Sequence, residues 1–164
     1  MTSVPRVLVI GVGNDYRGDD AVGLAVARRL RESPLLRVDV IEATGEGGRL
    51  IEAWTGYGAV VIVDAMRSTA AAGTVRRVDV TSEPAPAYFS HRSTHAIGVI
   101  DAVEMARAMG RLPGPVVLFG IEGAHYDAGT DLSPQVAAAV PAAVEVVGRE
   151  ARQLLETIGA SAHA

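Results

Sequence analysis

The sequence has 164 residues, 49% of them hydrophobic, which is enough for one globular domain with a buried core. Its formal net charge of -4 offers no basic field for a polyanion, so neither DNA nor RNA is an expected partner. All 15 basic residues are arginine, which excludes Schiff-base chemistry and a Walker-type phosphate lysine. The absence of cysteine excludes disulfides, thiolate nucleophiles and sulfur-ligated zinc.

The composition also bears on where the protein is found. No apolar stretch approaches the roughly 20 residues that cross a membrane, and strand-like sequence begins within a few residues of Met1. We therefore expect neither a signal peptide nor a membrane partner, and a monomeric, cytoplasmic protein. A single domain is expected over residues 1–164, with a frayed tail at 159–164.

Five segments have the character of β-strands. Three of them are continuously apolar and β-branched, as in strands covered on both faces of a parallel sheet. The segment 38–41 is shorter and typical of an edge strand, and 74–80 carries the charges of a partly exposed strand. In chain order the predicted strands are 7–10, 38–41, 59–63, 74–80 and 116–119.

Helical patterns lie between these strands. Apolar residues recur at helical spacing over 22–30, and 50–54 forms a second amphipathic stretch. A third apolar face, over 99–106, predicts a helix with Thr94 placed to cap its start and Gly110 its end.

The last helix is predicted to open with Ser133 as its N-cap and Pro134 at its first position. Pro141 is expected to kink or restart this helix before it runs to Ile158. The resulting order of elements is β-α-β-α-β-β-α-β-α. This alternation predicts an α/β fold, a three-layer α/β/α open twisted sheet of about five strands, mostly parallel with one antiparallel strand. In such sheets ligands bind beyond the carboxyl ends of the strands, where the strand order switches direction.

The stretch GVGNDYRGDD, residues 11–20, follows the first strand and matches a nucleotide-binding loop only in part. Tyr16 stands where a dinucleotide fingerprint needs its third glycine. Asp19 and Asp20 would repel a pyrophosphate at a helix N-terminus. A structural alternative is that the glycines permit a tight turn and that Asp19 or Asp20 caps the helix beginning near Ala21.

A further acidic residue is expected at the same edge of the sheet. Asp64 directly follows the strand 59–63, so its carboxylate should meet the acidic pair of the first loop. Carboxylates brought together repel unless a cation or a shared proton relieves them. His95, at the start of the third helix, completes a set of oxygen and nitrogen ligands suited to nickel, zinc or manganese. A turn cap at Asp64 and a capping or surface role for His95 are the structural alternatives.

Other polar residues are candidates of lower rank. Glu122 ends the last strand and is expected to lie behind the ligands, and His125 follows it in a loop that borders the site. Glu42, after the second strand, could imitate a ribose-binding acid. His91 is expected at the surface, and His163 in the tail should be solvated.

Four motifs taken together resemble those of the hydrogenase maturation endopeptidases. They are GVGNDYRGDD-AVG, VVIVDAM, STHAIG and FGIEG with LSP. These proteases process the large subunits of nickel-iron hydrogenases. The resemblance spans about Val7 to Ala139. Matched motif by motif, the family's ligands for nickel or a surrogate cation fall on Asp20, Asp64 and His95.

The resemblance implies that the protein removes a C-terminal peptide from the precursor of a hydrogenase large subunit once nickel has been inserted. Nickel would be supplied by the substrate, with zinc or cadmium as possible substitutes, and no organic cofactor is implied. The metal would polarise the scissile carbonyl or activate water, or it would serve recognition while a carboxylate acts as general base. Glu42 and Ala21 depart from the family's usual residues, which leaves a proton-transfer role for Glu42 open.

Parts of the sequence also resemble two other kinds of protein. A receiver-like phosphorylation domain would use Asp19, Asp20 and Asp64, but it also needs a lysine, which the chain lacks. A non-catalytic Rossmann-like nucleotide- or ligand-binding module is disfavoured by Tyr16 and the acidic pair.

Overall fold

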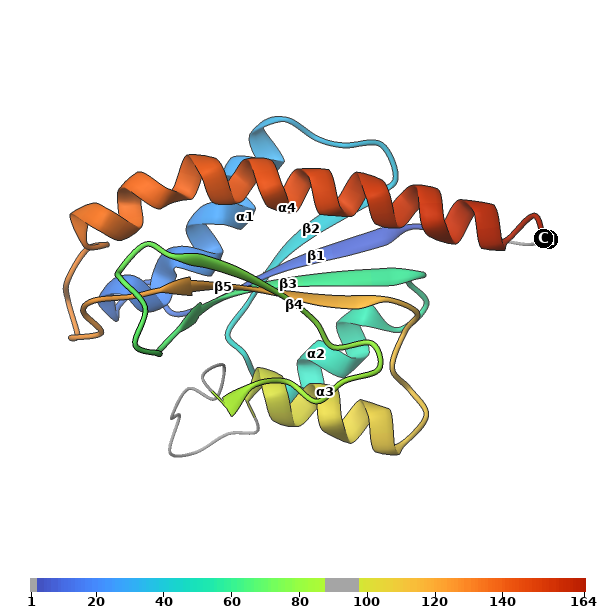
Figure 1. Cartoon of the computed structure of the whole chain (residues 1–164), viewed down its shortest axis with the longest axis horizontal. Helices are drawn as coiled ribbons and strands as arrows, with labels where there is room; N and C mark the ends of the chain where they lie inside the picture. The colour runs from blue at the N-terminus through green and yellow to red at the C-terminus, as the bar shows by residue number, and fades with distance from the viewer. Residues whose placement is uncertain (1–2, 88–97) are drawn as a thin grey trace.

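The computed structural model describes residues 3–87 and 98–164, and a five-stranded sheet lies at its centre (Figure 1). The strand order is β2-β1-β3-β5-β4, with β4 antiparallel to β5 and all other neighbours parallel. All five predicted strands are present, and the antiparallel one lies at an edge. The strands are β1 (Val7–Val12), β2 (Val38–Ala43), β3 (Ala59–Met66), β4 (Val75–Asp79) and β5 (Val116–Glu122).

Helices cover both faces of the sheet, which gives the predicted three-layer α/β/α architecture. Figure 1 shows α1 and α4 on one face and α2 and α3 on the other. A short 3-10 helix, η1, leads directly into α1. The helices are η1 (Gly18–Ala21), α1 (Val22–Glu32), α2 (Gly47–Trp54), α3 (Val99–Ala108) and α4 (Pro134–Ser161).

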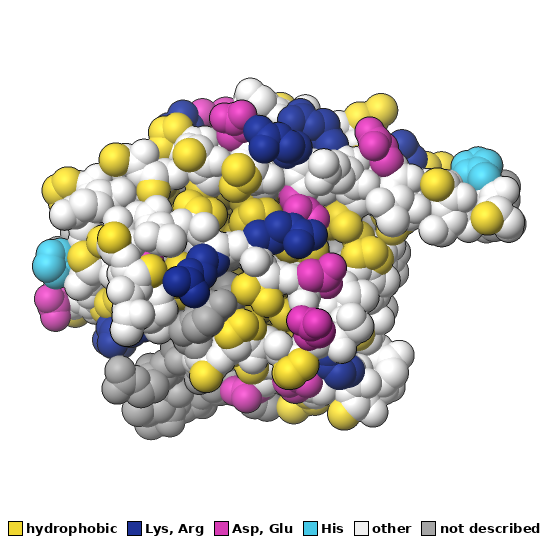
Figure 2. Space-filling view, in the orientation of Figure 1, with side chains coloured by type: hydrophobic (Ala, Val, Ile, Leu, Met, Phe, Trp, Pro, Cys, Tyr) yellow, Lys and Arg dark blue, Asp and Glu magenta, His cyan; other side chains and the backbone are white. Residues whose placement is uncertain are grey.

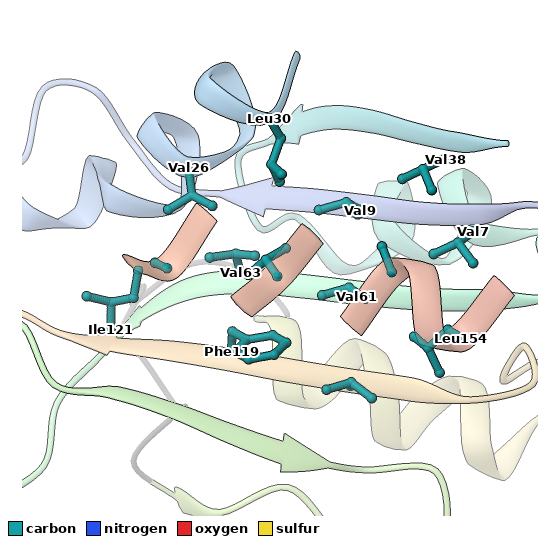
Figure 3. Close-up of a cluster of buried hydrophobic side chains, with 14 of the residues drawn as sticks. Val7, Val9, Val26, Leu30, Val38, Val61, Val63, Phe119, Ile121 and Leu154 are labelled. Atoms are coloured by element: carbon teal, nitrogen blue, oxygen red, sulfur yellow. The ribbon is translucent and has the colours of Figure 1, made fainter. Parts of the chain in front are cut away.

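Two apolar cores form because successive side chains of a strand point to opposite faces of the sheet. Val9, Val61 and Val63 pack beneath α1 and α4, in the cluster drawn in Figure 3. Their neighbours in sequence, among them Ile10 and Ile62, pack against α2 and α3. The continuously apolar strand segments are thus buried on both sides, as their composition predicts.

The topology fixes where a ligand can bind. From β1 the chain crosses through α1 to β2 on one side, and β3 pairs with β1 on the other side. The strand order therefore switches direction between β1 and β3. The carboxyl ends of β1, β3 and β5 point to the left in Figure 1, and the loops that follow them form the expected site region.

Helix α4 differs from its prediction in two ways. It does not restart at Pro141 but is one continuous helix, because the exposed proline removes a single backbone hydrogen bond while Val140 and Ala143 beside it are buried. It also extends to Ser161, beyond its predicted end at Ile158. Ile158 packs against the core, and the Ser161 hydroxyl donates to the Thr157 carbonyl, which supports the last turn.

An ion pair joins the edge strand β4 to α4. The Arg77 guanidinium donates to both carboxylate oxygens of Glu150, with Nε to Oε2 at 2.7 Å and Nη2 to Oε1 at 2.9 Å. Glu150 is buried, whereas Arg77 is half-exposed. Elsewhere in the view of Figure 2, basic and acidic side chains are interspersed over α4 and β4, without a large patch of one sign. No helix within the described residues is both long and apolar enough to cross a bilayer.

Glu150→Gln is expected to lower the free energy of unfolding by about 1–3 kcal/mol, because it replaces the charge-assisted pair with Arg77 by a weaker hydrogen bond. Urea denaturation followed by circular dichroism measures the change. An unaltered midpoint would show that the pair contributes nothing to stability.

Candidate functional site

Helix α1 begins directly above the carboxyl ends of β1 and β3. A methyl group on Gly23 would lie 2.3 Å from the Val12 carbonyl oxygen and 2.4 Å from that of Val63. Only glycine allows so close an approach. Asp20 lies in η1, three residues before Gly23, and Asp64 follows Val63 directly. The packing of α1 therefore brings the turn that carries Asp20 to the end of the strand that carries Asp64.

Gly11 and Gly13 allow the same close packing. A methyl group on Gly13 would lie 2.0 Å from the Asp20 carbonyl oxygen, and one on Gly11 would lie 2.3 Å from that of Gly23. Gly11 is in the extended backbone of β1, so it does not permit a tight turn as the structural alternative had it. Tyr16, in place of the fingerprint's third glycine, is 79% exposed.

Asp64 is buried at the carboxyl end of β3, with 6% of its surface exposed. The strand continues to Met66, so Asp64 lies within it and does not cap a turn as the structural alternative had it. Its Oδ1 accepts a hydrogen bond from the Ala65 N–H at 2.8 Å. Burial raises the pKa of Asp64 well above its ordinary value, and the negative charge of Asp20 raises it further. The two carboxylates that the sequence predicts to converge thus interact electrostatically.

The third predicted ligand, His95, lies outside the described residues, as do His91 and Thr94. Helix α3 begins at Val99, and Gly110, with φ of +64°, follows its C-terminus as predicted. Within residues 3–87 and 98–164, no three His, Cys, Asp or Glu side chains form a metal-binding group. The assignment of His95 as a ligand remains a prediction.

Asp19 does not cap a helix. Its side chain has no exposed surface and receives hydrogen bonds from the loop that follows β5. Oδ2 accepts from the N–H groups of Ala124 at 2.7 Å and His125 at 2.9 Å. The Ser133 N–H donates to Oδ1 at 2.6 Å and the Ser133 hydroxyl to Oδ2 at 2.7 Å. Ser133 begins α4, as predicted, but its hydroxyl bonds to Asp19 and not to its own helix.

The pKa of Asp19 reflects these contacts. Burial raises it, but the hydrogen bonds from Ser133, His125 and Ala124 outweigh burial and hold the pKa below the ordinary value of 3.8. Asp19 and Asp20 are neighbours in sequence with different environments. The sequence does not reveal these contacts of Asp19, because its four donors come from residues more than 100 positions away.

Glu122, expected behind the ligands, is buried and holds the loop after β3. It accepts hydrogen bonds from the Ser68 N–H at 2.9 Å and the Ser68 hydroxyl at 2.7 Å. In the neighbouring loop, the Tyr126 hydroxyl donates to the Met66 carbonyl at 2.9 Å, and Arg67 stacks 3.8 Å from the centre of the Tyr126 ring. Burial raises the pKa of Tyr126 to about 12. The loops after β3 and β5 are therefore joined beside the site.

Glu42 is engaged by arginines of α1. The Arg28 Nε donates to its Oε1 at 2.9 Å, and Arg31 contacts its other oxygen. Burial raises the pKa of Glu42, but its hydrogen bonds with Arg28 and Arg31 lower the pKa to a net value below the ordinary one. Arg28 also pairs with Asp15. His163 is exposed, as predicted.

The fold and the acidic pair define the class of protein: a three-layer α/β/α domain with two interacting carboxylates at its topological switch point. A family model described as "HycI: Hydrogenase maturation protease" matches residues 22–150, which is more than half of the chain. The chain therefore belongs to the hydrogenase maturation protease family. The resemblance found in the sequence motifs is confirmed, and a peptidase is favoured over the receiver-like and nucleotide-binding alternatives.

Individual relatives agree with this membership. The chain is 29% identical over 146 residues to the Hydrogenase 2 maturation protease of Escherichia coli K12, covering 87% of this chain and 88% of the relative. The solved structure of the E. coli hydrogenase maturating endopeptidase HybD superposes with a TM-score of 0.79 at 27% identity, covering 90% of this chain and 93% of that one. HybD from Thermococcus kodakarensis superposes with a TM-score of 0.73 at 31% identity, covering 89% of this chain and 99% of that one.

Gly23→Ala is expected to lower the free energy of unfolding by about 1–3 kcal/mol, because the added methyl group would overlap two carbonyl oxygens. Urea denaturation checks the change. Gly48→Ala is the matched control, since Gly48 lies in α2 with nothing within 4 Å of the added methyl group. The control should be neutral or stabilising by up to about 1 kcal/mol. Equal losses in both variants would contradict the steric account.

Asp64→Asn is expected to raise the melting temperature by a few degrees near neutral pH. The pKa of Asp64 is raised in the folded protein, so ionisation of this carboxyl group is easier in the unfolded chain. The free energy of unfolding therefore falls as the pH rises above 3.8, the ordinary pKa of the group. The amide removes the charge and can still accept from the Ala65 N–H. The gain should vanish below about pH 4. Thermal melts over this pH range check the prediction.

Asp39→Asn provides a control of opposite sign for these melts. The hydrogen bond from Arg6 lowers the pKa of Asp39, so this variant should lose stability at neutral pH and not gain it. A destabilised Asp64→Asn protein at neutral pH would contradict the electrostatic account of the site.

Proposed function

We propose that this protein is an endopeptidase that removes a C-terminal peptide from the nickel-loaded precursor of a nickel-iron hydrogenase large subunit. The observation that carries the proposal is the pair formed by Asp20 and buried Asp64 at the switch point of the sheet. The E. coli and T. kodakarensis relatives are hydrogenase maturation proteases by name, which supports a precursor of this kind as substrate. We further propose that the protein acts as a cytoplasmic monomer.

A divalent cation would resolve the repulsion between the two carboxylates. Burial and the charge of Asp20 both favour the protonated form of Asp64 in the metal-free protein. A cation held between the carboxylates would replace that proton and favour the charged form of both. Carboxylate oxygens together with the imidazole of His95 are ligands that suit nickel, with zinc or cadmium as possible substitutes.

Nickel enters this scheme as part of the substrate. A nickel ion already held by the precursor would use its open coordination positions to bind Asp20, Asp64 and His95, and would place the scissile bond at the carboxyl edge of the sheet. A precursor without nickel would lack this link. Binding would then report whether the metal has been inserted, and no organic cofactor is needed.

Two routes to hydrolysis fit this arrangement. The metal can polarise the scissile carbonyl or activate a water molecule, or it can serve recognition while one of the carboxylates acts as general base. In both routes Asp20, Asp64 and His95 are the essential residues. The routes differ in how strongly the rate should depend on the metal: precursor loaded with zinc or cadmium should be cleaved at an altered rate in the first and at a similar rate in the second.

Asp20→Asn, Asp64→Asn and His95→Ala should each reduce cleavage of the nickel-loaded precursor by about 100-fold or more, because each removes a proposed metal ligand. Mass spectrometry of the large subunit, before and after incubation with the protease, measures the loss of the peptide. Asp39→Asn is the matched control, since this carboxylate lies near the opposite end of β1 and pairs with Arg6. Normal cleavage by the three ligand variants would overturn the proposal, as would efficient cleavage of nickel-free precursor.

A further inference from the structure

The buried carboxylate of Asp19 lies next in sequence to the proposed ligand Asp20, and the mechanism above gives it no role. It has no exposed surface, and its two oxygens receive four hydrogen bonds of 2.6–2.9 Å. Three are donated by backbone N–H groups and one by the Ser133 hydroxyl. All come from the stretch 124–133, between β5 and α4, so Asp19 links two loops that are distant in sequence.

Backbone hydrogen bonds extend this link in both directions. The Asp19 N–H donates to the His125 carbonyl at 2.8 Å, and the Gly18 N–H donates to the Thr130 carbonyl at 3.2 Å. The Gly129 N–H donates to the Tyr16 carbonyl at 2.7 Å. Hydrogen bonds therefore hold residues 16–19 against the loop after β5, and the buried Asp19 carboxylate accepts four of them. We call this set of hydrogen bonds the attachment.

The position of this attachment in the sheet gives it a consequence for the site. Strand β3, which carries Asp64, lies between β1 and β5. The loops that Asp19 joins follow β1 and β5, so the attachment connects the two neighbours of β3 at the carboxyl edge. A methyl group on Gly123 would lie 3.0 Å from the Asp19 Cβ, which shows how closely the loops approach. Asp20 directly follows Asp19 in the chain, so the attachment also restrains the backbone of Asp20.

We propose that Asp19 is a positioning residue, which holds Asp20 at the separation from Asp64 that a bridging nickel ion requires. The inference rests on the proposed nickel-dependent function. Without the attachment, the repulsion between Asp20 and Asp64 would be free to move the turn away from β3. Groups that orient metal ligands without touching the metal commonly determine a large part of its affinity.

The test compares Asp19→Asn with Glu150→Gln. Both replace a buried carboxylate by its amide, but Glu150 is paired with Arg77 on β4 and has no link to Asp20. In Asp19→Asn, an NH2 group replaces one of the two carboxylate oxygens. It cannot accept hydrogen bonds from the N–H groups at that position, so part of the attachment is lost. The measurement is calorimetric titration with nickel ion, at a temperature at which circular dichroism shows that all the proteins are folded. Asp19→Asn should bind nickel about 10–100-fold more weakly than the wild type. Glu150→Gln should bind nickel like the wild type although it is also destabilised.

Enzyme kinetics provide a second measurement. Asp19→Asn should raise the KM for nickel-loaded precursor, and Glu150→Gln should leave it unchanged. Ser133→Ala removes one of the four hydrogen bonds and should weaken nickel binding by a smaller factor, so it decides the question if Asp19→Asn does not fold. Wild-type nickel affinity and KM in the Asp19 and Ser133 variants would overturn the positioning role. A wild-type protein that neither binds nickel nor cleaves the loaded precursor would instead overturn the proposed function.

Discussion

The close packing of α1 on the ends of β1 and β3 is the constraint on which the site depends. Gly23 rests against the carbonyl oxygens of Val12 and Val63, at distances that leave no space for a side chain. Because η1 leads directly into α1, this contact places Asp20 near Asp64 although their charges repel. Backbone packing over an apolar core therefore holds together two groups that would otherwise separate.

The acidic residues around this contact have different electrostatic environments. Hydrogen bonds from Ser133, His125 and Ala124 stabilise the charge of Asp19, and arginines of α1 stabilise that of Glu42, so the pKa values of both are lowered although burial opposes this. Burial and Asp20 instead disfavour the charge of Asp64. An unfavourable charge held in place by a rigid fold is characteristic of a site whose stability is reduced for the sake of binding or catalysis.

Much of the fold could be predicted because its signals are local. Continuous apolar runs identified the buried strands, and the charged segment 74–80 was recognised as a partly exposed strand, which is the antiparallel edge strand β4. The predictions failed where local and tertiary effects compete. Proline at position 141 favours a helix break, but buried neighbours on both sides keep α4 continuous. The helix also continues past its predicted end at Ile158, since Ile158 packs against the core.

For the site, the sequence by itself determined which residue types follow which strands, and so placed the acidic pair and Asp64 at one edge of a parallel sheet. Only the tertiary structure decided their individual roles. It buried Asp19 among donors supplied by residues 124–133 and left Asp20 beside Asp64. The physical reason is that a carboxylate's role depends on the donors and charges around it, and here these come from distant parts of the chain that meet only when the sheet and helices pack together.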